Sequence, residues 1–157
     1  MNYSLESITE IISNSVSLLQ IQQPMLFIQD NDISEETVST TLHAFLSPNF
    51  PEYHLNCEYN RMTDENGNQI SKRIHRNPNA KNPSLVLPDI IVHHQEDGRH
   101  NLLVIEIKMA WKNREKEEDY NKLIGYTSEL RYKYGLYLEL GEQGITEMTW
   151  FQNGKKI

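Results

Sequence analysis

Two short, wholly apolar runs constrain the fold of this chain more than any other feature of its sequence. The first extends from Ile90 to Val92 and the second from Leu102 to Ile105. Continuous apolar runs of this length are typical of strands that are buried on both faces, because a half-exposed strand alternates apolar and polar residues. We therefore expect strands over about 86–93 and 101–108, joined as a hairpin by the turn signal Asp97-Gly98.

The rest of the chain supplies elements that would flank these strands. Apolar residues at helical spacing predict helices, and alternating or apolar runs predict further strands. The order of helix, three strands, helix and strand predicts an α/β fold, a mixed β-sheet flanked by α-helices. Met25 to Ile28 is a candidate for an added strand, and the polar, Asn-rich segment 62–84 is interpreted as a long loop or hairpin. The further helices are expected over 5–19, 34–46 and from the charged segment 112–119 to about 131, and the further strands over 53–61, 136–140 and 146–151.

Size and charge limit the function classes. A chain of 157 residues with 38% hydrophobic and 24% charged residues is typical of one soluble domain. Its net charge of −7 argues against a nucleic-acid partner. However, residues 1–60 contain no Lys or Arg and eight acidic residues, whereas all 15 basic residues fall in 61–157. A local basic surface can bind phosphate on an acidic protein, so a nucleic-acid partner stays open.

Several further features concern location and metal sites. No apolar run approaches the length of a membrane span, and the N-terminus lacks the basic region of a secretory signal. Cys57 is the single cysteine and cannot form an internal disulfide, which fits a cytoplasmic protein. The six histidines include the neighbours His93 and His94, but no Cys/His set has zinc spacing. His93 is interpreted as lining a site or as a hydrogen-bonded residue near a strand end.

The charges at the ends of the two central strands predict a site. Asp89 begins its strand and Glu106 ends the antiparallel partner, so both lie at the same end of the sheet. Lys108 is two residues from Glu106 and points to the same face. Two carboxylates suit Mg²⁺ or Mn²⁺, with the backbone carbonyl of Ile107 as a further ligand, and the ammonium suits a phosphodiester. The alternatives are a structural salt bridge between Glu106 and Lys108 and a turn role for Asp89.

Glu35 lies on the inward apolar stripe of the helix expected over 34–46, with Val38 and Leu42. Asp32 and Ser34 are candidates for the cap of this helix. An acid on an inward stripe has two interpretations. Glu35 either forms a capping box with Asp32 or faces the candidate site.

These strings together resemble the PD-(D/E)xK nuclease superfamily, whose fold is the restriction-endonuclease-like fold. The resemblance rests on Leu-Pro-Asp-Ile-Ile-Val-His at 87–93, Asn-Leu-Leu-Val-Ile-Glu-Ile-Lys at 101–108, Asp-Tyr-Asn-Lys-Leu at 119–123 and Tyr-Lys-Tyr-Gly at 132–135. It covers about residues 34–140, and the strings look like those of small bacterial members. It implies an αβββαβ core within residues 31–157, preceded by a helical extension at 1–30 that packs on it.

The resemblance also implies roles for individual residues. Asp89 and Glu106 would be metal ligands, Lys108 the catalytic lysine, and Glu35 a glutamate from the first core helix. The implied function is a Mg²⁺-dependent nuclease that hydrolyses phosphodiester bonds, most readily in DNA, through a metal-activated water. The alternative is a catalytically inactive nuclease-fold protein that serves in binding or as a scaffold.

Basic residues after position 60 are candidates for nucleic-acid binding. Lys72, Arg73 and Arg76 lie in the polar segment, and Lys122 lies in the helix after the motif. For Lys122 the alternative is a surface pair with Glu118, which is four residues away on the same helix. The helix at 5–19 is also a candidate surface for a homodimer, and no membrane partner is expected.

Overall fold

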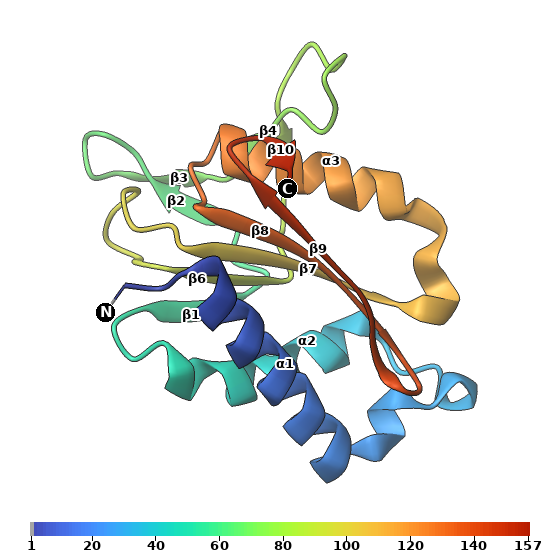
Figure 1. The fold of residues 1–157 in the computed structure, drawn as a ribbon. Coiled ribbons are helices and arrows are strands. Elements are labelled where there is room, and N and C mark those ends of the chain that lie inside the picture. The colour runs from blue at the N-terminus through green and yellow to red at the C-terminus, as the bar shows by residue number, and fades with distance from the viewer. Residues whose placement is uncertain (1) are drawn as a thin grey trace.

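A mixed β-sheet with helices on both faces forms the fold of this protein (Figure 1). The computed structural model describes residues 2–157, without the side chains of residues 113 and 114. The α/β architecture expected from the sequence is confirmed: the main sheet has six strands in the order β1-β6-β7-β8-β9-β10. These strands are β1 His54–Cys57, β6 Ile90–His93, β7 Leu103–Met109, β8 Tyr134–Gly141, β9 Gly144–Gln152 and β10 Lys155–Lys156.

Three α-helices and two small ladders complete the described elements. The helices are α1 Leu5–Gln22, α2 Glu35–Leu46 and α3 Lys116–Ser128. The ladders join β2 Arg61–Thr63 to β3 Gln69–Ser71, and β4 Arg73–Ile74 to β5 Ser84–Leu85. Short 3₁₀ segments are η1 Pro24–Phe27, η2 Gln29–Asn31, η3 Ser47–Asn49 and η4 Ala110–Glu115.

The two central strands, β6 and β7, pair as the hairpin that the sequence predicts. β6 and β7 are antiparallel, with Ile90 opposite Ile105. β7 and β8 are parallel, and α3 forms the crossover between them. A parallel pair needs a connection of a dozen residues or more, which this helix supplies.

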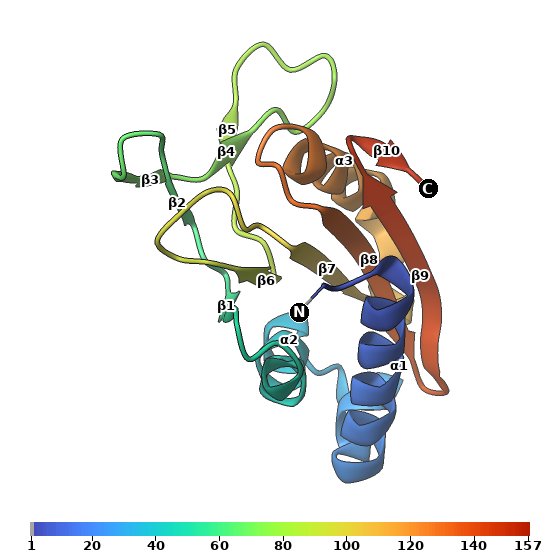
Figure 2. The same cartoon turned by 60° about the vertical axis from the view of Figure 1, so that its left-hand side comes forward.

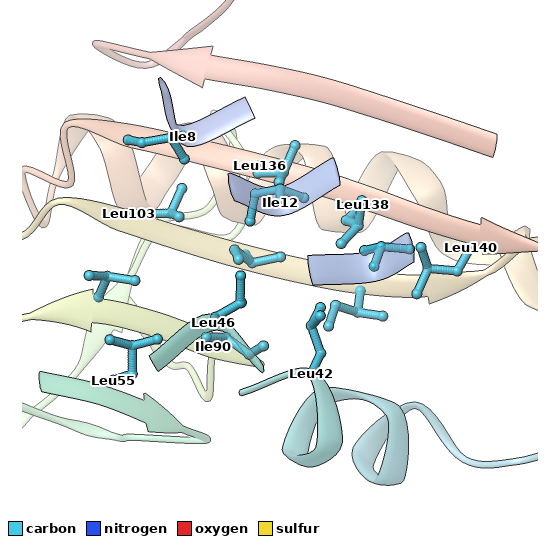
Figure 3. Packing of buried hydrophobic residues seen from close by; sticks show 14 of the residues in the cluster. Ile8, Ile12, Leu42, Leu46, Leu55, Ile90, Leu103, Leu136, Leu138 and Leu140 are labelled. Carbon is cyan, nitrogen blue, oxygen red and sulfur yellow. The ribbon is translucent and has the colours of Figure 1, made fainter. Parts of the chain in front are cut away.

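The two faces of the sheet carry separate cores. α1 and α2 cover one face and α3 covers the other (Figure 2). On the first face, Ile8 and Ile12 of α1 point toward Leu103 and Leu136 of the sheet (Figure 3). On the second face, Val104 and Ile91 pack with Leu123 and Tyr126 of α3, among others. Burial on both faces explains why the central strands are continuously apolar.

Helix α1 shares the first core with the sheet rather than standing apart from it. Its capping box at Ser4 begins the helix, and its apolar stripe is fully buried at Ile8, Ile12 and Leu19. Among residues 2–157, no helix combines the length and the hydropathy that a crossing of a lipid bilayer needs. The boundary near residue 30 and the homodimer stay predictions.

Several local predictions are wrong. Met25 to Ile28 lies in and after the 3₁₀ turn η1 rather than in a strand, because Pro24 begins that turn. The two central strands begin later than expected, at Ile90 and Leu103, since the Val86 N–H donates to the Lys72 carbonyl outside the main sheet and residues 94–102 form a loop. Of the two cap candidates for helix α2, Ser34 is confirmed, since its Oγ accepts the Thr37 N–H. Because Ser34 is the cap, Glu35 is the first rather than the third residue of the helix, and Asp32 pairs with Lys112 at 2.9 Å, so the capping box of Asp32 and Glu35 is wrong.

Candidate active site

Asp89 and Glu106 face α3 from neighbouring strands. Val104 and Ile91 belong to the core beneath α3. Glu106 is two residues after Val104 and Asp89 is two residues before Ile91, so both share this face. The register that pairs Ile90 with Ile105 places Asp89 opposite Glu106 at the next position. Strand parity and pairing thus bring together two acids that are far apart in the sequence.

The backbone around Asp89 fixes its carboxyl group. Asp89 Oδ2 accepts the N–H of Ile107 at 2.8 Å. The N–H of Glu58, which has a positive φ of 52°, donates to the Pro88 carbonyl at 3.0 Å. Burial raises the pKa of Asp89, although the Ile107 N–H and nearby groups oppose the shift. Asp89 is therefore held against β7 rather than left in a free turn.

Glu106 is 2% exposed and forms the buried centre of the cluster. Tyr126 Oη donates to Glu106 Oε1 at 3.1 Å, and Lys122 Nζ lies 3.4 Å from the same oxygen. Burial raises the pKa of Glu106 well above its usual range, and the adjacent Asp89 carboxyl raises it further. The ionised form of Glu106 is thus unfavourable until a cation or a proton compensates it.

Lys108 follows Glu106 on the same face and pairs with Asp119 of α3. Lys108 Nζ lies 3.1 Å from Asp119 Oδ2, and Lys122 Nζ lies 3.4 Å from Asp119 Oδ1. Burial lowers the pKa of Lys108, but Asp119 and then Glu35 more than reverse this, so its pKa is raised. The alternative expected from the sequence was a salt bridge between Glu106 and Lys108. Instead, Lys108 pairs with Asp119 of α3, and Glu106 pairs with Lys122 of α3.

Glu35 reaches the same end of β7 from the other side of the sheet. It is the first residue of α2, and its Oε2 accepts the N–H of Met109 at 3.1 Å. Met109 directly follows Lys108, and the negative charge of Glu35 contributes to the raised pKa of Lys108. The structure thus brings together Asp89, Glu106, Lys108 and Glu35, the four residues selected from the sequence.

The charges of this cluster are unbalanced in a way that suits a divalent cation. Glu35, Asp89, Glu106 and Asp119 supply four carboxyl groups, whereas Lys108 and Lys122 supply two ammonium groups. The raised pKa values of Asp89 and Glu106 have the same origin, because burial disfavours two adjacent negative charges. Hard carboxylate oxygens of this kind fit Mg²⁺ or Mn²⁺.

The backbone of Ile107 fits the role of a further oxygen ligand. Its N–H points toward Asp89. In an antiparallel pair the N–H and C=O of one residue point to the same neighbouring strand. We therefore expect the Ile107 carbonyl to point to the same side of β7 as its N–H, toward Asp89, which directly precedes β6.

Two residues of the cluster, Asp119 and Tyr126, were not selected from the sequence. Asp119, Lys122 and Tyr126 are spaced by three and four residues, so they line one face of α3 together with Leu123. Polar residues on an inward helical stripe are the signal that could have identified them. Lys122 pairs with Glu106 and Asp119, so its expected surface pair with Glu118 is wrong.

The basic residues of the polar segment have different environments. Lys72 is 1% exposed, its Nζ donates to Tyr132 Oη at 3.0 Å, and it lies over the rings of Tyr59 and Tyr132. The prediction that Lys72 contacts nucleic acid is therefore wrong, because a phosphate cannot reach its ammonium group. Arg73 and Arg76 are exposed and stay candidates.

His93 does not line the carboxylate cluster. It is 4% exposed at the far end of β6, and its Nε2 lies 2.8 Å from Asn56 Oδ1. Burial, with the nearby Lys72 and other histidines, lowers the pKa of His93 to about 3. The interpretation as a hydrogen-bonded residue near a strand end is the one that fits.

No family model, curated protein or solved structure matches this chain.

Proposed function

We propose that this protein is a Mg²⁺-dependent nuclease of the PD-(D/E)xK type that hydrolyses phosphodiester bonds, most readily in DNA. The observation that carries the proposal is the convergence of Asp89, Glu106 and Lys108 on one sheet face, with Glu35 at the end of the same strand. The four carboxyl groups of the cluster, of which Glu106 and Asp119 are buried, outnumber the two lysines, and uncompensated buried charge destabilises a fold. Binding of a metal ion would compensate the negative charge of these carboxyl groups and would account for their presence.

The order of elements supports the same proposal. Helix α2, strands β1, β6 and β7, helix α3 and strand β8 follow one another as αβββαβ, apart from the two small ladders. This is the order expected for a restriction-endonuclease-like core. Helix α1 and strand β9 would then be additions that cover one face and extend one edge.

Asp89, Glu106 and the Ile107 carbonyl would hold the cation at the end of the hairpin. Such a cation, when bound, would lower the pKa of a bound water and neutralise charge on the phosphate oxygens. Asp89 is pre-oriented by the Ile107 N–H, and Glu106 by Tyr126. These hydrogen bonds hold both carboxyl groups in place without substrate, which lowers the cost of binding.

Lys108 would act as a cation on the scissile phosphate. The raised pKa of Lys108 keeps it an ammonium at neutral pH, so it donates hydrogen bonds and does not accept a proton. Its partner Asp119 would be a positioning residue, because it holds the ammonium beside the carboxyl pair. In many enzymes, hydrogen-bond donors directed at the negative charge that develops in the transition state make the largest contribution to the rate enhancement.

The test is cleavage of plasmid, linear duplex, single-stranded DNA and RNA with Mg²⁺ or Mn²⁺. We expect Lys108→Met and Asp89→Asn to reduce the rate by about 10²–10³-fold, the loss typical of one electrostatic contact in a transition state. The matched control is Lys112→Met, which removes an ion-paired lysine outside the cluster. A Lys108→Met protein that melts normally and cleaves at the wild-type rate would refute the assigned role.

An inactive binding or scaffold protein is the second candidate, and one observation favours it. Lys108 and Lys122 already pair with Asp119 and Glu106, so the cluster is partly neutralised without metal. Thermal unfolding in a Mg²⁺ or Mn²⁺ titration separates the two functions, since a ligand that binds the native state stabilises it by mass action. No shift and no cleavage of any substrate would favour the scaffold.

A further inference from the structure

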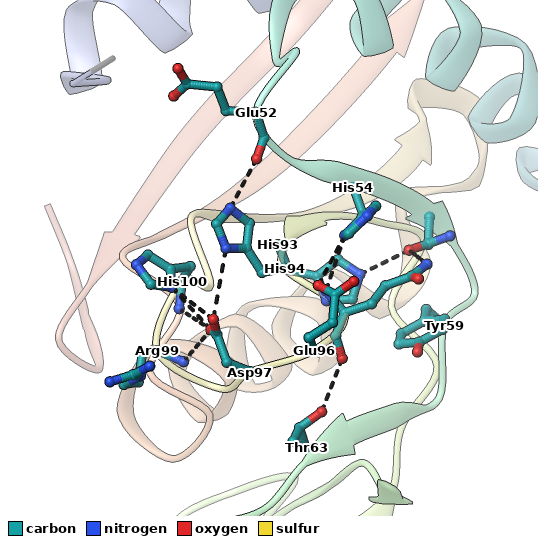
Figure 4. Close-up of polar contacts among 12 residues, drawn as sticks. Glu52, His54, Tyr59, Thr63, His93, His94, Glu96, Asp97, Arg99 and His100 are labelled. Atoms are coloured by element: carbon teal, nitrogen blue, oxygen red, sulfur yellow. Dashed lines mark hydrogen bonds and ion pairs between the residues drawn. The ribbon is translucent and has the colours of Figure 1, made fainter. Parts of the chain in front are cut away.

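The loop between β6 and β7 holds a second group of metal-ligating side chains. His94, Asp97 and His100 each offer one ligand atom, and these atoms lie within 4.8 Å of one another. Figure 4 shows the three side chains turned toward each other. His94 follows the last residue of β6 and Asp89 precedes the first. At 3.3 Å per residue, about 16 Å of strand separates this group from the carboxylate cluster.

The distances from the Asp97 carboxylate oxygens to the two histidines lie on either side of the spacing in a tetrahedral site. Asp97 Oδ1 lies 3.0 Å from His100 Nδ1, and Asp97 Oδ2 lies 3.8 Å from His94 Nδ1. Zinc bonds of 2.0–2.2 Å in a tetrahedron place neighbouring ligand atoms about 3.4 Å apart. The ligand atoms lie within 4.8 Å of one another, so the side chains must draw closer to share one ion, and His100 Nδ1 must release the hydrogen that it donates to Asp97.

The surroundings orient two of the three ligands. His94 Nε2 lies 2.9 Å from the Glu52 carbonyl oxygen. Because a carbonyl only accepts, Nε2 carries the hydrogen and a neutral His94 presents the lone pair of Nδ1 toward Asp97. Metal-bound histidines commonly donate their other N–H in this way. Asp97 Oδ1 accepts the backbone N–H groups of Arg99 and His100 at 3.0 and 3.1 Å, which fixes the carboxylate.

We propose that His94, Asp97 and His100 bind Zn²⁺, or a transition-metal dication of similar preference, with water as the fourth ligand. Two imidazoles and one carboxylate suit zinc, whereas Mg²⁺ prefers oxygen ligands throughout. Together with the Mg²⁺ site of the proposed function, the protein would then have two metal sites of different chemistry at opposite ends of one hairpin. The zinc site fastens the loop 94–102, and through His94 it also anchors Glu52 in the segment before β1.

Titration calorimetry of the full chain with ZnSO₄ in saturating MgCl₂ tests this site, because Mg²⁺ occupies the oxygen ligands of the other cluster. We expect the wild type to bind one Zn²⁺ per chain and to melt at a higher temperature with zinc. His94→Asn and His100→Asn should each weaken binding by more than about tenfold, since even the loss of an outer partner costs that much.

The matched control is His75→Asn. His75 Nδ1 lies 2.7 Å from Glu129 Oε1, so it is also a histidine paired with a carboxylate, but on other elements. We expect this variant to keep wild-type zinc affinity. Thermal unfolding in EDTA checks the fold of each variant. Because His100 is exposed, we expect its substitution to lower stability least. Absence of zinc binding by the wild type, or unchanged affinity in both cluster variants, would overturn the proposal.

Discussion

Glu106 places a carboxyl group at a buried interface between sheet and helix, where its ionised form lacks the solvation of water. Its folded pKa is raised above the usual value. Below about pH 4.5 Glu106 is protonated in both the folded and the unfolded chain, so its burial does not lower the free energy of unfolding through ionisation. As the pH rises through the folded pKa, the unfolded chain has already released its proton, and stability falls.

We therefore expect Glu106→Gln to stabilise the metal-free protein at pH 8 and to lose this advantage as the pH falls toward 4.5. A gain of about 1 kcal/mol would raise Tm by a few degrees in a chain of this size. The amide can still accept the hydrogen bond from Tyr126. Thermal unfolding in EDTA from pH 4.5 to pH 8 measures the effect. In Mg²⁺ the wild type should gain stability and the variant should not, and equal Mg²⁺ stabilisation of both would contradict the metal role.

Lys72 presents the opposite case of a buried cation. Burial lowers the pKa of Lys72 to about 8 from 10.5, because its surroundings are a hydroxyl group and aromatic rings. Between pH 8 and pH 10.5 the unfolded chain therefore binds the extra proton, so native stability rises with pH in this window. Below pH 8 the full cost of the buried ammonium is present.

Lys72→Met should remove this pH dependence. We expect the stability of the wild type relative to Lys72→Met to increase by about 3 kcal/mol from pH 8 to pH 10.5, the free energy that a shift of this size implies. Other groups that titrate in this range cancel in the comparison. Urea unfolding of both proteins at several pH values measures the difference. A constant difference across the range would show that Lys72 is solvated in the native state.

These two residues also show where sequence reasoning succeeds and fails. Glu106 was identifiable because it ends a strongly apolar strand, and strand parity fixed its face. Lys72 was misassigned because its short segment has no periodicity, so nothing in the sequence indicated that it points inward. The proposed zinc group of His94, Asp97 and His100 does not follow from the sequence either, since one of its ligands is an aspartate and the common zinc patterns use Cys and His.

At the scale of elements, Glu35 joins α2 to the end of β7. The helix packs on one face of the sheet, while Glu106 and Lys108 lie on the other. Glu35 links them because it is the first residue of α2 and bonds to the Met109 N–H at the strand end. The sequence placed Glu35 on an inward stripe but left the capping alternative open. The position of α2 relative to the end of β7, which the sequence does not give, decides between a capping role for Glu35 and a role at the site.

Two substitutions separate the structural and chemical roles of Glu35. Glu35→Gln keeps an acceptor for the Met109 N–H, so we expect nearly wild-type stability but slower cleavage. Glu35→Ala leaves the N–H unpaired and should cost about 1–3 kcal/mol. Thermal unfolding in EDTA and cleavage rates with Mg²⁺ measure the two effects. Full activity of Glu35→Gln would assign Glu35 a purely structural role.

The order of elements was predictable because long apolar periodicity survives in the folded protein. The residues at which the strands begin and end were not predictable, because pairing with other strands in the folded protein determines them. Residues 86–89 look strand-like in sequence, yet the Val86 N–H donates to the Lys72 carbonyl instead of joining the main sheet. The two small ladders in 61–85 are too short to leave a pattern in the sequence.

The distribution of charge over the whole molecule limits how it can bind a polyanion. The chain carries a net charge of −7, and its first 60 residues contain no Lys or Arg. Lys108 and Lys122 are neutralised within the cluster. Arg73 and Arg76 are exposed, and the intervening Ile74 packs closely against Gly125, one turn of α3 from Lys122. These two arginines therefore stay candidates for contacts with a phosphate backbone on the α3 side of the sheet.

We expect duplex DNA to bind weakly, with a shallow dependence on salt. Contacts to two phosphates give a slope of about −2 for the logarithm of affinity against the logarithm of salt concentration. Fluorescence anisotropy of a labelled duplex with the Asp89→Asn protein measures it without cleavage. Arg73→Glu combined with Arg76→Glu should remove most of the binding, whereas Lys72→Met, at a buried lysine beside them in the sequence, should leave it unchanged. A slope of about −5 or steeper, or unchanged binding by the arginine variant, would place the nucleic-acid surface elsewhere on the molecule.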